Sequence, residues 1–420
     1  MYNGINIMSA LSPNGNGVNQ RKIEASHYLW IVLPLICGIQ VADALTGQGV
    51  PVLYPYIRDD FGLSRAQIGF ITSAYSMGGL LSSVLAGWLT DKMGVKRISV
   101  ISLASMAVFT IAILMTYSWT IILILMLLVG VATSPGYPAS TRAIMDWVPA
   151  RFRALAMSVK QMGVPLGGAL MAAMLPILTV VIGWRMAGAS MGVLVLIFAI
   201  VFMLLYRDPP QSAEVIHKLD TSTKQAVFRN RGLVVPIVWA TTITGFHFIV
   251  LTYFMLFLIE TLQLSPIIAG GALAIIQVSS GIGRVMWGAA SDFVFHGRRI
   301  MVLAITGFLT AMWLWGISLM SAGVPNVAVY VLAVLIGIST LSYQGVFTTL
   351  IGETAGPGRI GVTAGVANTV IRIGMLVMPP LFGYLVDMNN SYYLGWRIGA
   401  AVALVITLAL LIFGRETHHR

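Results

Sequence analysis

Residues 87–97, GWLTDKMGVKR, form a short polar stretch where two long apolar runs meet. The runs on either side, 66–90 and 97–117, each reach the length of about 20 residues that a helix needs to cross about 30 Å of hydrocarbon. A strand of a membrane barrel needs only about 9–11 residues, so both runs are too long for a barrel. The stretch therefore predicts a tight loop between two membrane-spanning helices.

The same alternation of apolar runs and short polar gaps extends along most of the chain. Of the 420 residues, 58% are hydrophobic and only 9% are charged, whereas soluble proteins carry about 25% charged residues. So few charges predict an outer surface that mostly faces lipid. The expected fold is an all-α polytopic membrane protein with twelve transmembrane helices, at residues 28–52, 66–90, 97–117, 119–141, 153–181, 186–206, 233–260, 266–291, 299–321, 326–350, 361–386 and 394–414.

The net charge of +11 raises the question of nucleic-acid binding, but the basic residues punctuate the gaps between runs rather than forming one face. Eighteen of the 25 Lys and Arg residues lie in segments on the same side as the N-terminus, and four lie opposite. Because cytoplasmic loops are enriched in Lys and Arg, this bias predicts that both termini are cytoplasmic. We expect the lipid bilayer and no nucleic acid as partner, and a bacterial inner membrane as location.

A polar segment at residues 208–231 divides the runs into two sets of six. The segments GWLTD (87–91) and GAASD (288–292) follow the second run of each set, and GWR recurs at 183–185 and 395–397. These echoes predict two pseudo-symmetric six-helix bundles, 27–207 and 232–414, around a central cavity with binding near the midplane. Residues 1–26 are predicted to be a disordered cytoplasmic tail without a signal peptide, and 415–420 a second cytoplasmic tail.

The loop at 87–97 resembles the signature loop between helices 2 and 3 of the major facilitator superfamily, G-x-x-x-D-[RK]-x-G-x-[RK]-[RK], at every defined position. The resemblance implies a monomeric transporter whose Asp91, Lys92 and Arg97, with Asp292 in the second half, form cytoplasmic gate contacts. Further gate pairs are expected between Asp146 and Arg153 and between Glu353 and Arg359. The alternative is that the basic residues of the loop only set topology.

Ionisable residues inside membrane helices are costly and mark function by default. Asp43, Lys160, Arg284 and Arg372 fall within predicted spans, and His247 is a fifth titratable candidate. Three cations against one acid leave a positive excess that an anionic substrate would neutralise. The planar fork of arginine also suits a carboxylate, which favours an organic anion.

Two further resemblances bear on these charges. The run RVMWGAASD from Arg284 resembles helix 8 of monocarboxylate porters and of the oxalate/formate antiporter, in which the arginine binds substrate carboxylate. The latter family places a second cation in helix 11, which here contains Arg372. The alternative for Arg284 is a structural ion pair without substrate contact.

The first span contains VAD (41–43) and is similar to the opening of the anion:cation symporter family, whose helix 1 often carries A-D-R. Here Ala44 replaces that arginine, and Lys160 beside Gln161 is expected to compensate. Asp43 is predicted to carry the coupling proton, because a carboxyl in a low-dielectric site can cycle between charge states near neutrality. The alternatives are a structural Asp43–Lys160 pair and, for His247, a packing role instead of proton coupling.

The remaining expectations concern substrate contacts and chemistry. Substrate oxygens are predicted to accept hydrogen bonds from Tyr75, Tyr253, Tyr343, Gln161 and Gln344. The sequence contains no metal-ligand cluster, phosphate-binding loop or nucleophile with a positioned base, so we expect no enzyme activity, no metal and no cofactor other than a coupling proton.

The predicted function is proton-coupled uptake of a small mono- or dicarboxylate by alternating access. An anion/anion exchanger is the nearest alternative, and a proton-coupled drug exporter is another. Drug antiporters place an arginine in helix 4 where this chain has Leu127, and their helix 5 motif G-P-x-x-G-G is only echoed by GVPLGG at 163–168. A non-transporting receptor would normally need an added signalling domain.

Overall fold

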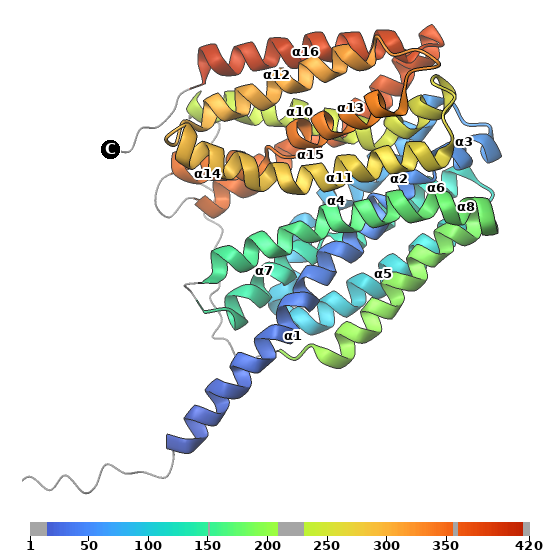
Figure 1. Cartoon of the computed structure of the whole chain (residues 1–420). Helices are drawn as coiled ribbons and strands as arrows, with labels where there is room; N and C mark the ends of the chain where they lie inside the picture. Colours follow the sequence, from blue (N-terminus) through green and yellow to red (C-terminus); the bar gives the residue numbers. More distant parts are fainter. Residues whose placement is uncertain (1–14, 150–151, 209–230, 356–359, 415–420) are drawn as a thin grey trace, which may run out of the picture.

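The computed structural model describes residues 15–149, 152–208, 231–355 and 360–414, and every regular element in these ranges is a helix (Figure 1). The first half contains α1 (Gly15–Gly47), α2 (Gly49–Val52), α3 (Tyr54–Phe61), α4 (Arg65–Met93), α5 (Val95–Met115), α6 (Trp119–Thr133), α7 (Gly136–Trp147) and α8 (Arg153–Leu205). The second half contains α10 (Arg231–Glu260), α11 (Pro266–Ala289), the π-helix η3 (Ala290–Val294), α12 (Arg299–Ile317), α13 (Asn326–Thr340), α14 (Gln344–Ala355), α15 (Ile360–Asn389) and α16 (Tyr392–Phe413).

Among the described residues, 11 helical stretches are long and apolar enough to cross a membrane. One of them, α8, is 53 residues long and contains two of the predicted spans. It turns back at Gly183, where φ is 77° and ψ is 156°, a conformation that glycine adopts readily (Figure 1). With α8 counted as two spans, the prediction of twelve transmembrane helices is confirmed.

The helices form two bundles, α1–α8 and α10–α16, that lie side by side (Figure 1). The bundles meet along two seams, one between α4 and α15 and the other between α8 and α11. The prediction of two six-helix bundles is confirmed. Whether the halves begin and end at the predicted residues stays a prediction, since part of the central segment lies outside the described residues.

Three predicted spans are each broken into two helices, and the first is interrupted at Gln48, between α1 and α2. The fourth is interrupted at Ser134 and Pro135, between α6 and α7, and the tenth at 341–343, between α13 and α14. Broken backbone inside a membrane is tolerated only where protein or water satisfies the freed groups. The breaks therefore place helix ends, with their partial charges, in the interior of each half.

Two ends of the bundle carry most of the charge, and we name each by one residue. The Arg65 end includes α3, the start of α4 and the ends of α10 and α15. The Asp91 end includes the end of α4, the start of α12 and the ends of α7 and α14.

Glycines bring α4 and α6 into close contact. A Cβ at Gly130 would overlap the carbonyl oxygen of Tyr75, and one at Gly78 would overlap that of Leu127. The same arrangement recurs in the second half, where a Cβ at Gly337 would overlap the carbonyl oxygen of Ile276. Small residues at such positions let membrane helices approach each other closely.

We expect Gly130→Leu to lower the melting temperature of the purified protein, because α6 would have to move away from α4. Overpacking of this kind costs about 1–3 kcal/mol. Thermal unfolding in detergent, followed by tryptophan fluorescence, measures the effect.

Gly316→Ala is the matched control, since a Cβ at that position in α12 meets no atom within 4 Å. It should melt within a small margin of the wild type. Equal melting temperatures for both variants would contradict the close packing of α4 on α6.

Candidate functional site

Asp43 lies one turn before the end of α1, beside the first turn of α7. Gly136, the first residue of α7, makes room for the carboxylate, since a Cβ there would overlap Oδ2 and lie 3.0 Å from Oδ1. Gln40 donates to Oδ2 at 3.5 Å, and the buried Oδ1 has no hydrogen-bond partner in the described part of the chain. The helix N-terminus stabilises the ionised carboxylate, while Oδ1 remains available to accept a proton.

Lys160 is only 1% exposed and is held inside the first half. Its Nζ donates to Thr141 Oγ1 at 2.8 Å and lies 4.1 Å from the centre of the Tyr137 ring. Asp43 interacts with it electrostatically without forming a salt bridge. The lysine and the carboxylate therefore compensate each other within one half, at longer range than the structural pair considered above.

Arg284, in α11, reaches across the seam between the halves. Its Nη1 donates to the Gln161 carbonyl of α8 at 3.5 Å, and its Nε donates to the Leu341 carbonyl at 3.4 Å. Leu341 is the C-cap of α13, so the guanidinium sits where the partial negative charge of that helix favours a cation. Arg284 also interacts electrostatically with His247 and Tyr343.

Arg372 faces the first half from α15. A Cβ at Gly79 of α4 would lie 2.5 Å from its Nη1, so the glycine leaves space for the guanidinium. Tyr75, one turn earlier in α4, interacts electrostatically with both Arg372 and Asp43. The rotation of α15 thus places Arg372 toward the seam rather than toward lipid.

None of Lys160, Arg284 and Arg372 has a carboxylate within salt-bridge distance among the residues that the structure describes. The two arginines make only long hydrogen bonds to neutral groups or none that is described. In this conformation, the alternative that Arg284 belongs to a structural ion pair is not supported.

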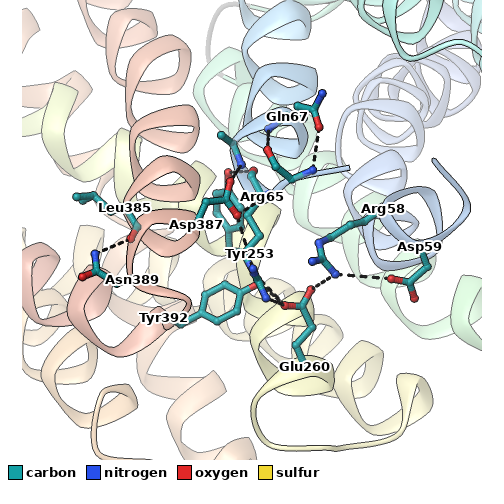
Figure 2. Close-up of polar contacts among 12 residues, drawn as sticks. Arg58, Asp59, Arg65, Gln67, Tyr253, Glu260, Leu385, Asp387, Asn389 and Tyr392 are labelled. Atoms are coloured by element: carbon teal, nitrogen blue, oxygen red, sulfur yellow. Dashed lines mark hydrogen bonds and ion pairs between the residues drawn. The ribbon is translucent and has the colours of Figure 1, made fainter. Parts of the chain in front are cut away.

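The Arg65 end is closed by charge contacts between the halves (Figure 2). Glu260, the last residue of α10, accepts from Arg65 Nη2 at 2.7 Å and pairs with Arg58 Nη1 at 3.1 Å. The Tyr392 hydroxyl donates to the same carboxylate at 3.0 Å. One acid of the second half therefore holds two arginines of the first.

Asp387, near the end of α15, adds a second cross-half contact. Its oxygens accept from the backbone N–H groups of Arg65 at 3.0 Å and Ala66 at 2.8 Å, and one oxygen lies 3.6 Å from Arg65 Nη1. The carboxylate thereby caps the N-terminus of α4, which favours a negative charge.

Neutral hydrogen bonds continue this closure inward. The Thr72 hydroxyl bonds to Thr252 at 2.9 Å across the seam and to Tyr54 at 3.0 Å. The Tyr253 hydroxyl lies 2.8 Å from the carbonyls of both Arg65 and Pro379. In this conformation the Tyr253 hydroxyl takes part in the closure at the Arg65 end, and its contact with substrate stays a prediction.

The chain also matches known proteins. The sequence signature of the Major Facilitator Superfamily matches residues 36–379. The chain belongs to the major facilitator superfamily. It is accordingly a member of a transporter family and not of an enzyme family.

Relatives within the superfamily cover nearly the whole chain. The probable sulfoacetate transporter SauU of Cupriavidus necator is 25% identical over 93% of this chain and 94% of its own length. The hexuronate transporter of Bacillus subtilis is 23% identical over 91% and 94%, respectively. A bacterial homolog of the human lysosomal transporter Spinster has the same fold, with a TM-score of 0.74, 17% identity and coverage of 92% and 96%.

The superfamily loop lies at the Asp91 end, where each described ion pair joins residues of one half. Asp91 pairs with Arg142 at 3.1 Å, and Asp292 and Glu353 share Arg299. Lys92 stacks over the ring of Trp88 at 4.9 Å, and Arg97 is exposed. The predicted gate acids and bases are thus at one end of the molecule, in a state in which they do not bridge the halves.

The predicted pair of Asp146 with Arg153 is not formed in this conformation, and the pair of Glu353 with Arg359 stays a prediction. Asp146 pairs with Arg142 at 3.7 Å, whereas Arg153 donates to the carbonyls of Val148 and Met145. Glu353 pairs with Arg299 at 3.1 Å, and its predicted partner Arg359 lies outside the described residues. The Arg142–Asp146 spacing of four residues on one helix was a signal that could have identified the first partner.

The other predicted substrate contacts come from both halves. Tyr343 is buried in the second half, where its hydroxyl bonds to Thr244. Gln344 is half-buried at the start of α14, and Gln161 is half-buried in α8. His247 is 4% exposed and stacks on Phe248, and neither of its ring nitrogens has a hydrogen-bond partner in the described part of the chain.

An apolar groove of about 530 Å³ follows the other seam, between α4, α6 and α15. Its lining includes Phe70, Met77, Leu123, Leu376 and Pro380, and none of the lining side chains is charged. The groove does not suit a small anion, so the site of interest is the set of charged groups around Asp43, Arg284 and Arg372.

Proposed function

We propose that this chain is a secondary active transporter that moves a small organic anion, a mono- or dicarboxylate, by alternating access with proton symport. The observation that carries the proposal is the placement of Arg284 and Arg372, which face the first half with no carboxylate in salt-bridge distance among the described residues. Guanidinium groups in such a place bind carboxylates well, because they offer two parallel donors. The relatives named for sulfoacetate and hexuronate support this substrate class.

Alternating access is supported by the contrast between the two ends. At the Arg65 end, charged pairs join the halves, and at the Asp91 end, the described pairs lie within each half. The distribution of Lys and Arg favours the Asp91 end as cytoplasmic. We therefore interpret this conformation as closed to the outside, in a monomer of the bacterial inner membrane with both termini in the cytoplasm.

In this scheme Asp43 carries the coupling proton, and Lys160 and the N-terminus of α7 tune its charge state. An anion/anion exchanger would use the same two arginines without needing a coupling acid. The two mechanisms differ in a single measurable property, which is net uptake driven by a pH gradient.

We expect Asp43→Asn to abolish net uptake of D-glucuronate into proteoliposomes driven by an inward proton gradient, while exchange between internal and external anion continues. The amide cannot bind and release the proton but retains the size of the side chain. Radiolabelled uptake at two external pH values, with empty and preloaded vesicles, measures both activities.

Asp59→Asn is the matched control, because that carboxylate is 79% exposed and pairs only loosely with Arg58. It should behave as the wild type. Unchanged gradient-driven uptake in Asp43→Asn would reject the coupling role, and the absence of flux of any organic anion in the wild type would reject the transport proposal.

A further inference from the structure

A hydrogen bond between two glutamines joins the halves above Arg284. Gln277 Nε2 of α11 donates to Gln48 Oε1 at 2.6 Å. Gln277 is only 2% exposed, and Gln48 sits at the break between α1 and α2. Polar side chains are costly to bury inside a membrane protein, and where they occur they often mark a functional site.

The chain makes space for this pair with one glycine. A Cβ at Gly168 of α8 would overlap Gln48 Oε1 and lie 2.6 Å from Gln277 Nε2. Its neighbours Gly163 and Gly167 instead pack against the backbone of α1. The GVPLGG motif in the sequence therefore has two roles, close packing on α1 and accommodation of the two carboxamides.

The pair lies at a defined height above the arginine. Gln277 precedes Arg284 by seven residues, which is two turns of α11, so both lie on nearly the same face about 10 Å apart along the axis. The contacts on α8 keep the same order, since Arg284 meets Gln161 and Gln277 lies at Gly168, seven residues further along that helix. Between these two levels, Gly281 of α11 faces Met162 and Pro165 of α8.

The carboxamides have unused hydrogen-bonding capacity. Each offers two N–H donors and two acceptor lone pairs, and the bond between them uses one donor and one lone pair. The unused groups can bind a hydroxyl or a second acid group of a ligand whose first carboxylate is held by Arg284. A site built to hydrogen-bond such a group strongly disfavours analogues that lack it.

We propose that Gln48 and Gln277 form a specificity-determining subsite that selects anions carrying a second polar group at the far end from the carboxylate. The proposal rests on the proposed function, because it assumes that Arg284 holds a carboxylate. Since the glutamines belong to different halves, a ligand that joins them also links the halves on the closed side. The pair must separate when the Arg65 end opens.

The test compares two probes, D-glucuronate with distal hydroxyls and propionate with none, by titration of purified protein. We expect the wild type to bind D-glucuronate more tightly. Gln277→Leu should weaken D-glucuronate binding at least tenfold and leave propionate binding unchanged, and Gln48→Leu should do the same. Combining the two substitutions should add little, because they remove one shared subsite.

Two milder variants distinguish loss of the subsite from misfolding of the protein. Gln277→Asn keeps the amide but shortens its reach, and Gly168→Ala displaces the amides without changing them, so both should show the same selective loss. A loss that is equal for the two probes, or absent, overturns the subsite while the proposed function stands. A wild type that binds neither probe overturns both.

Discussion

Replacing Arg284 by glutamine is expected to abolish the thermal stabilisation of the purified protein by organic carboxylates. Loss of one partner of a buried, hydrogen-bonded charge pair costs about 2–5 kcal/mol, and each 1.4 kcal/mol is about tenfold in affinity. Binding of D-glucuronate should therefore weaken by about thirtyfold or more. Titration of the melting temperature against ligand concentration measures the change, since a ligand that binds the folded state stabilises it.

Two companion variants make the result specific to the guanidinium. Arg284→Lys keeps the charge but not the planar fork, so it should bind with intermediate affinity. Arg397→Gln removes an exposed arginine at the Arg65 end and should bind as the wild type does. Undiminished carboxylate binding in Arg284→Gln would remove the substrate class and favour the drug-exporter alternative, with flux of bulky apolar cations as its signature.

Glu260→Gln is expected to open the Arg65 end. The carboxylate holds Arg58 and Arg65 together, and its side chain is only 18% exposed, so solvent screens these contacts weakly. Hydrogen bonds to charged groups contribute about 1.5–3 kcal/mol each, which corresponds to about a ten- to hundredfold change in the population of the open state.

Labelling of one introduced cysteine reports this opening. The single native cysteine, Cys37, is replaced by serine, and Thr252→Cys places a thiol beneath the closure, at a position that is 1% exposed. A membrane-impermeant maleimide added from outside should react at least tenfold faster in Glu260→Gln. Asp59→Asn, an exposed neighbour, should leave the rate unchanged, and equal rates in all three proteins would show that the charges do not hold this end shut.

The sequence was sufficient for the number of spans and their division into bundles, because lipid demands long apolar runs. The interruptions at Pro135 and near Ser342 were not predicted, although both fall in short polar stretches, TSPGYP (133–138) and STLSYQG (339–345), within otherwise apolar runs. The sequence also separated the two arms of α8, which the backbone joins through a turn at Gly183 in a non-helical conformation. The length and hydropathy of an apolar run do not predict where its backbone breaks or turns.

For the site, charge in an apolar run identified Asp43, Arg284 and Arg372, because ionisable groups in a membrane stand out from their surroundings. The rotation of each helix could not be predicted, and contacts to Gln161 and Gly79 were needed to place the two arginines at the seam.

Neutral polar residues of the site were harder to identify from the sequence than charged ones. Gln48 went unnoticed, although it follows Gly47 at the point where α1 ends, and a glycine before a glutamine in an apolar run was the available signal. Tyr253 was assigned to substrate because tyrosines in spans look alike, and only its bonds to the carbonyls of Arg65 and Pro379 show its place in the closure.

The cap that Asp387 places on α4 affects which amino-acid substitutions can accumulate at this contact during evolution. The carboxylate binds two main-chain N–H groups, which every residue type except proline supplies, so drift at Arg65 or Ala66 leaves that half of the contact in place. No such redundancy protects Asp387 itself. For this cap, inherited variation should therefore be tolerated less at Asp387 than at Ala66, while Arg65 stays constrained by its own side-chain contact with Glu260.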